Sequence, residues 1–75
     1  MLVQELDITN EVCPMTFVRT RLALDRMQSG EVLHVRLLGE EPRSNVKTNA
    51  VSLGHALLSD EPGPEGVRLI AIRRR

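Results

Sequence analysis

Hydrophobic and polar residues alternate in two well-separated segments of the chain. Residues 2–8 place Leu6 and Ile8 on one side of an extended backbone and acidic side chains on the other. Residues 31–38 repeat this alternation, with His34 on the polar side. A period of two residues is typical of a strand that buries one face. Both segments are therefore predicted to be half-buried strands.

Two other segments carry apolar residues at intervals of three and four, the spacing of one helix face. The first, residues 15–28, follows Pro14, and proline is well tolerated at the first position of a helix. Within it, the pairs Val18–Leu22 and Phe17–Leu24 are spaced for a broad apolar face. The second, residues 43–53, also follows a proline and ends before a glycine, which favours a second helix.

Two more strands complete the pattern. Residues 56–59 are a short candidate, and residues 67–72 are apolar on both faces and thus suited to the centre of a sheet. The turn at 62–66 predicts an antiparallel hairpin between them. The order βαβαββ predicts an α/β (α+β) two-layer sandwich, with two helices packed on one face of a four-stranded mixed sheet. Residues 1–75 are expected to form a single domain.

The amino-acid composition argues against several classes of function. Ten basic and ten acidic residues balance to zero net charge, and Phe17 is the only aromatic residue. A nucleic-acid binder usually has a basic excess, and single-strand binders stack bases on several aromatic rings, so no direct nucleic-acid binding is expected. The sequence has no apolar run of about 18 residues and no signal-peptide pattern. We expect no membrane association and a cytoplasmic location.

Cys13 is the only cysteine, so no disulfide can form within the chain. Two histidines and one thiol cannot supply the usual zinc ligand sets, and we expect neither a metal nor a cofactor. Cys13 directly precedes the predicted first helix, where unpaired N–H groups and the helix dipole stabilise a thiolate. Its pKa should fall below the free value of about 8.5. Arg19 and Arg21, a turn or more into the helix, could add to this effect.

Such a thiolate could attack a persulfide or a disulfide, or accept a sulfur atom. A Cys-X-X-Cys pair is absent, and neither histidine is near Cys13 in the sequence, so an internal redox cycle and a local Cys–His hydrolytic pair lack support. The alternative is that Cys13 is a small buried residue, as free cysteines often are. The residues alone leave both interpretations open.

Residues 12–19 (Val-Cys-Pro-Met-Thr-Phe-Val-Arg), followed at helical length by residues 27–31, resemble the TusA (SirA-like) sulfur-carrier family. Residues 6–8 and 54–55 add to the resemblance, which covers almost the whole chain. It implies a sulfurtransferase that carries sulfane sulfur as a persulfide on Cys13. It also implies protein partners: a cysteine desulfurase or rhodanese-type donor and a downstream acceptor in tRNA thiolation, molybdenum-cofactor synthesis or sulfur oxidation. A monomer is expected.

Thr16 departs from the family motif, which is typically Cys-Pro-X-Pro. A second proline would stiffen the first helical turn and help to aim the sulfur. Thr16 could accommodate the helix, and its hydroxyl could form a local hydrogen bond. The departure leaves an alternative function open, namely a non-enzymatic interaction or regulatory module that kept the fold and lost sulfur transfer.

The other polar candidates have ordinary structural interpretations beside functional ones. Arg19, Arg21 and Arg26 could dock an acidic partner or form a solvated helix face. The pair at 40–41 suits the positive end of the second helix. His34 and His55 are expected to be structural or surface residues, Met15 and Met27 to pack in or beside the core, and Arg73–Arg75 to be a solvated tail.

Overall fold

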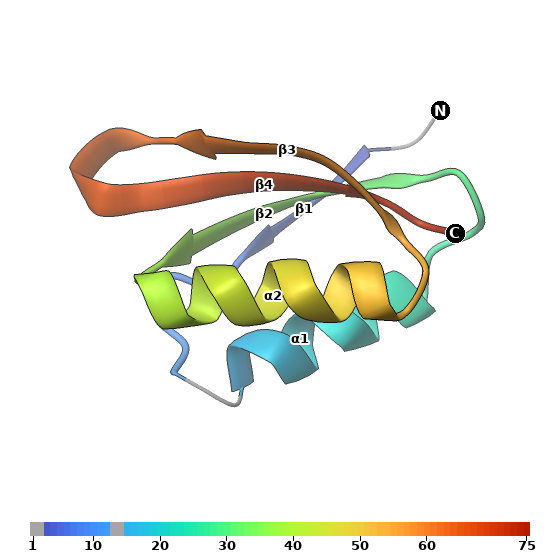
Figure 1. Cartoon of the computed structure of the whole chain (residues 1–75), viewed down its shortest axis with the longest axis horizontal. Coiled ribbons are helices and arrows are strands. Elements are labelled where there is room, and N and C mark those ends of the chain that lie inside the picture. Colours follow the sequence, from blue (N-terminus) through green and yellow to red (C-terminus); the bar gives the residue numbers. More distant parts are fainter. Residues whose placement is uncertain (1–2, 13–14) are drawn as a thin grey trace.

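The computed structural model describes residues 3–12 and 15–75. In this part of the chain, two helices and a four-stranded sheet form two layers (Figure 1). The predicted fold class and the order βαβαββ are confirmed. The elements are β1 (Val3–Asp7), α1 (Met15–Asp25), β2 (Val32–Leu38), α2 (Glu40–Ser52), β3 (Ala56–Pro62), the 3₁₀ turn η1 (Pro64–Gly66) and β4 (Val67–Arg73).

The sheet has the strand order β1-β2-β4-β3. β1 runs parallel to β2, whereas β4 is antiparallel to both of its neighbours. The predicted central position of β4 and the predicted β3–β4 hairpin are therefore confirmed. Both helices lie on the same face of the sheet, and the other face is open (Figure 1).

The core lies between this sheet and the two helices. On β2, Leu33, Val35 and Leu37 point inward while His34 and Arg36 are exposed, as the alternation predicts. The buried core cluster comes from four elements and from the segments just after β1 and α1: Ile8, Leu24, Met27, Leu33, Val35, Leu37, Val46, Ala50, Ile70 and Ile72.

The face that α1 buries differs from the predicted one. Its buried residues are Thr16, Thr20 and Leu24, four residues apart, whereas Val18 and Leu22 are exposed. The predicted apolar face is therefore confirmed for Leu24 and wrong for Val18 and Leu22. The hydroxyl of Thr20 donates a hydrogen bond to the carbonyl oxygen of Thr16 at 2.8 Å, which allows its polar group to be buried.

α2 begins three residues earlier than predicted. The first helical hydrogen bond runs from the Arg43 N–H to the Gly39 carbonyl at 3.2 Å. Pro42, the third residue of α2, costs no intrahelical hydrogen bond because the first N–H groups of any helix lack a partner. The acidic residues Glu40 and Glu41 therefore lie inside the first turn, where the helix dipole favours negative charge.

The end of α2 is a Schellman motif, so the prediction that the helix ends at Gly54 is confirmed. The Gly54 N–H donates to Val51 O at 2.9 Å, and the His55 N–H donates to Ala50 O at 3.0 Å. Gly54 has φ = 89°, which glycine adopts without a steric penalty. The motif turns the chain directly into β3.

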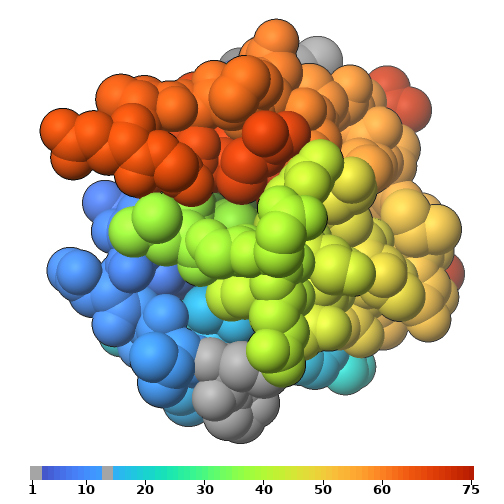
Figure 2. Space-filling view, turned by 60° about the vertical axis from the view of Figure 1, so that its left-hand side comes forward, coloured from blue at the N-terminus to red at the C-terminus, as the bar shows by residue number. Residues whose placement is uncertain are grey.

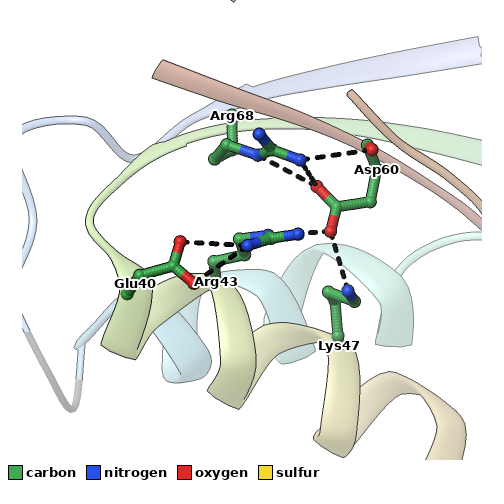
Figure 3. Close-up of polar contacts among 5 residues, drawn as sticks. All are labelled: Glu40, Arg43, Lys47, Asp60 and Arg68. Atoms are coloured by element: carbon green, nitrogen blue, oxygen red, sulfur yellow. Dashed lines mark hydrogen bonds and ion pairs between the residues drawn. The ribbon is translucent and has the colours of Figure 1, made fainter. Parts of the chain in front are cut away.

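One carboxylate ties α2 to the β3–β4 hairpin (Figure 3). Asp60 on β3 accepts hydrogen bonds from Lys47 at 2.7 Å and Arg43 at 2.8 Å, both on α2, and from Arg68 on β4 at 2.9 Å. Its side chain is only 11% exposed. Burial by itself would raise the pKa of Asp60, but the hydrogen bonds from these three cations outweigh burial and hold the pKa well below its ordinary value.

A register shift between Leu57 and Ser59 explains why Asp60 points inward. Leu57 pairs with Ile72 and Asp60 pairs with Ile70, both core residues of β4. Without the extra residue, strict alternation from Leu57 would place Asp60 on the open face of the sheet. The bulge thus places the carboxylate opposite α2.

The C-terminal residues are anchored, which corrects the expectation of a solvated tail. Arg73 belongs to β4, and the side chain of Arg74 donates to Leu24 O at the end of α1 at 2.8 Å. The Arg75 N–H donates to Nδ1 of the buried His55 at 3.0 Å. These contacts connect the end of β4 to the end of α1 and to the segment after α2.

Candidate functional site

Cys13 and Pro14, the central candidates from the sequence, lie outside the described residues. The residues on either side of them are held by backbone hydrogen bonds. The Glu11 N–H donates to Ile8 O at 3.1 Å, and the Met15 N–H donates to Val12 O at 2.8 Å, joining the two flanks of residues 13–14 directly. α1 begins at Met15, so the predicted helix start next to Cys13 agrees with the structure to within two residues.

The loop before α1 reaches the same end of the molecule as the start of α2 and the β3–β4 hairpin. Figure 1 shows both helices beginning at this end, and Figure 2 shows the loop in blue, the start of α2 in yellow-green and the hairpin in orange. This end lies away from the C-terminal anchor at Arg74 and Arg75 (Figure 1).

An exposed apolar stripe consists of one residue of the loop before α1 and three residues of α1. Its members are Val12, Met15, Val18 and Leu22, with 74%, 42%, 37% and 48% of their surface exposed. On a helix, residues three and four apart are neighbours, so the three members on α1 share one face. A row of apolar side chains that remains in water is a feature of protein-interaction surfaces.

The two candidate docking arginines have different partners. Arg19 contacts Glu11 through Nε at 3.1 Å and Nη2 at 3.0 Å, so it reaches back to the loop before Cys13. Arg21 lies 3.9 Å from Asp25 along the same helix. Sequence reasoning missed Glu11, because a pair eight residues apart across a loop has no periodic signal.

Thr16 is buried to 99%, and its hydroxyl has no hydrogen-bond partner among the described residues. The local hydrogen bond that the sequence analysis considered for this hydroxyl is thus not made to any described residue. The position that holds the second proline in the family motif is thus an enclosed one, and the Thr16 side chain anchors the first turn of α1 against the core.

The two histidines lie apart from the stripe. His34 is exposed on the open face of the sheet, where it lines a shallow hollow of about 460 Å³ together with Glu5, Arg36 and Ala71. His55 is buried beside the C-terminal residues. Burial lowers the pKa of His55, the positive charges of Arg74 and Arg75 lower it further, and Asp25 opposes them.

The described part of the chain has no group of three or more histidine, cysteine, aspartate or glutamate side chains arranged to hold a metal ion. Within residues 3–12 and 15–75, neither helix is long and apolar enough to cross a bilayer.

Comparison with known proteins agrees with this picture. Residues 4–74 match the family described as sulfurtransferase TusA. A protein of Archaeoglobus fulgidus is 40% identical over 70 residues, covering 93% of this chain and 80% of the relative. A protein of Thermotoga maritima is 37% identical over 60 residues, covering 79% and 76%. Both bear the name "Putative sulfur carrier protein".

The fold has a close counterpart among solved structures. The crystal structure of a SirA-like protein from Desulfitobacterium hafniense superimposes with a TM-score of 0.83 and covers 96% of each chain, at 23% identity. This likeness establishes the shared two-layer fold. Because the family match spans nearly every residue, the chain belongs to the TusA (SirA-like) family of sulfurtransferases.

Proposed function

We propose that this protein is a sulfur carrier that accepts sulfane sulfur as a persulfide on Cys13 and passes it to a downstream protein. The observation that carries the proposal is the place of the sole cysteine in the sequence, two residues before α1 and between the exposed stripe residues Val12 and Met15. Membership of the TusA family and the names of two relatives support the same role. The compartment we propose is the cytoplasm, where a free thiol stays reduced.

The transfer is an exchange between thiolates and persulfides. The Cys13 thiolate attacks the outer sulfur of the donor's persulfide, a new S–S bond forms, and the donor cysteine leaves as a thiolate. In the second step the acceptor's thiolate attacks the outer sulfur on Cys13, which leaves in turn. Sulfur moves with no net oxidation. A lower pKa of Cys13 speeds the second step, because a weaker base is a better leaving group.

The start of α1 favours the charged forms on this route. α1 is eleven residues long. The N–H groups of its first turn and the positive end of its dipole face the preceding loop. Both the thiolate and the terminal persulfide anion would be stabilised there.

The apolar stripe is the proposed contact surface for donor and acceptor. Interfaces combine an apolar centre with a polar rim, and Arg21 lies at this rim, 52% exposed on its side chain. An acidic rim on the partner would complement it and accelerate association. The acceptor belongs to a relay such as tRNA thiolation, molybdenum-cofactor synthesis or sulfur oxidation.

A two-stage sulfur-transfer assay tests the proposal. The protein is incubated with a cysteine desulfurase and cysteine labelled on sulfur, separated from the donor, and then offered to an acceptor thiol. We expect label on the wild type, release of the label to the acceptor, and no label on Cys13→Ser. If wild type and Cys13→Ser both stay unlabelled with desulfurase and rhodanese-type donors, the chain is an interaction module instead.

A further inference from the structure

The two arginines of α1 contact different parts of the molecule, and this difference assigns them different tasks. We propose that Glu11 and Arg19 form a clasp that positions the Cys13 thiol, whereas Arg21 serves partner docking. The inference rests on the proposed function, because it assigns positioning and docking roles within the sulfur transfer on Cys13.

The clasp joins the two sides of the cysteine segment. Glu11 is in the loop before residues 13–14, and Arg19 is in the second turn of α1. A single glutamate oxygen, Oε1, receives Nε at 3.1 Å and Nη2 at 3.0 Å. The contact therefore joins two residues that flank Cys13 in the sequence, one before it and one after it.

Two other contacts hold the same loop. The Met15 N–H donates to Val12 O at 2.8 Å, and the Thr16 side chain is buried in the core. The Glu11 N–H also donates to Ile8 O at 3.1 Å, so the residue carrying the carboxylate is itself fixed to the end of β1. The Glu11–Arg19 contact adds the only side-chain ion pair recorded between this loop and α1 within the described residues.

Arg21 has no such connection. Its guanidinium is 3.9 Å from Asp25, one turn further along α1, and that pair involves no residue of the loop. An arginine in a long, exposed ion pair can exchange its partner for an acidic group on another protein at little cost. Arg21 therefore fits the docking role, and Arg19 fits the positioning role.

Direct electrostatics and positioning make opposite predictions for Glu11. If Glu11 and Arg19 acted only through their charges, removing the glutamate charge would favour the nearby thiolate, and removing the arginine charge would disfavour it. If they act as a clasp, either change loosens the loop, and the sulfur spends less time at the positive end of α1. Both changes then slow the reactions of the Cys13 thiol, namely its alkylation and its loading with sulfur.

The test compares Glu11→Gln, Arg19→Gln and the charge-swapped double variant Glu11→Arg/Arg19→Glu with the wild type. The controls are Arg21→Gln and Asp25→Asn, the matched pair on the same helix. Alkylation of Cys13 by iodoacetamide at neutral pH measures the thiol alone. Single-turnover sulfur transfer from a cysteine desulfurase, at varied donor concentration, separates the maximal rate from the half-saturating concentration.

We expect both single clasp variants to be alkylated and loaded about two- to fivefold more slowly, the range for exposed ion pairs, with unchanged half-saturation. The charge swap restores the wild-type rates. Arg21→Gln raises the half-saturating donor concentration and leaves alkylation unchanged. Faster alkylation of Glu11→Gln, unchanged alkylation of both single variants, or failure of the swap to restore the rate would overturn the clasp.

The two readouts separate failure of the clasp from failure of the proposed function. Alkylation requires only a thiol and no sulfur donor. If no variant accepts sulfur while the alkylation pattern holds, the clasp stands as a positioning device for Cys13 and the sulfur-carrier function is wrong. If sulfur transfer proceeds and the single variants match the wild type in alkylation and loading, the sulfur-carrier function stands and the clasp is wrong.

Discussion

Among single residues, Thr16 shows how one polar group can be enclosed at an energetic cost. Its hydroxyl lacks a partner in the described part of the chain, although the side chain is fully buried. A buried hydroxyl without a hydrogen bond is destabilising by about 1–3 kcal/mol. The proline that the family motif places at this position would bring no hydroxyl into the core.

Thr16→Val is therefore expected to stabilise the fold. Valine keeps the branched shape and removes the unpaired hydroxyl, so the free energy of unfolding should rise by about 1 kcal/mol. For a domain of this size the melting temperature should rise by about 4–8 °C. Thr20→Val is the matched control, because the Thr20 hydroxyl donates to Thr16 O and its loss brings no such gain. A lower melting temperature for Thr16→Val would show that the hydroxyl is hydrogen-bonded.

The residues that sequence reasoning identified and those it missed differ in the kind of information they need. The arginines of α1 and the helix start beside Cys13 follow from local spacing. Glu11 and Asp60 do not, because each acquires its role from a contact with another element. A single sequence gives no direct signal for a carboxylate that is placed by a loop or by a bulge.

At the level of elements, Asp60 connects three of them through three cations. Asp60→Asn keeps the size of the side chain and removes the charge. Arg43, Lys47 and Arg68 would then lose the charged group that they share, and Arg43 would keep only its contact with Glu40. Removing one partner of a partly buried ion cluster should lower the free energy of unfolding by about 2–3 kcal/mol, measured by urea denaturation. Glu61→Gln, on the neighbouring exposed residue, should change it by less than about 0.5 kcal/mol.

The same carboxylate should make the fold sensitive to acid. The pKa of Asp60 is lowered in the folded state, so the folded protein resists protonation at pH values where the unfolded chain binds a proton. The stabilisation is complete above the ordinary aspartate pKa of about 3.9 and is lost as the pH falls below it. Urea midpoints of the wild type should therefore fall more steeply below about pH 4 than those of Asp60→Asn. Parallel curves would contradict this role.

Element order and sheet centre follow from the sequence because periodicity and turn residues are local signals. The burial of β2 and the end of α2 at Gly54 were predictable for the same reason. The rotation of α1 about its axis was not predictable, since Thr16 and Thr20 face the core while Val18 and Leu22 face solvent. The packing of α1 against α2 and the sheet sets that rotation. The same rotation leaves the apolar stripe exposed to solvent.

For the whole molecule, the contact between His55 and Arg75 links two distant parts of the chain. Nδ1 of His55 accepts the Arg75 N–H, so the bond requires an unprotonated Nδ1. Burial, followed by the charges of Arg74 and Arg75, lowers the pKa of His55. The unfolded chain therefore binds the proton first as the pH falls through the ordinary histidine value of about 6.5.

Stability should consequently decrease from about pH 7 to about pH 5, well above the range of the carboxylates. In His55→Gln, which has no titrating group at this position, the melting temperature should vary less over the same interval. His34→Gln is the control, because His34 is exposed on the open face of the sheet. Equal pH dependence of the wild type and His55→Gln would contradict a role for His55 in anchoring the end of β4.

The C-terminal anchor lies at the end of the molecule opposite the proposed site (Figure 1). The C-terminal anchor and the Schellman motif lie at one end, while the loop before α1, the apolar stripe and the start of α2 lie toward the other (Figures 1 and 2). Changes at the anchor should therefore alter stability without altering sulfur transfer in the temperature range where the protein stays folded.

Intact-mass spectrometry with peptide mapping tests the central claim most directly. The protein is incubated with a cysteine desulfurase and cysteine, then compared with Cys13→Ser and with a sample treated with reductant. We predict a gain of one sulfur atom that maps to the peptide containing Cys13, disappears on reduction and is absent in the variant. A wild-type mass that stays unchanged with both classes of donor, while iodoacetamide still alkylates Cys13, would contradict the sulfur-carrier function.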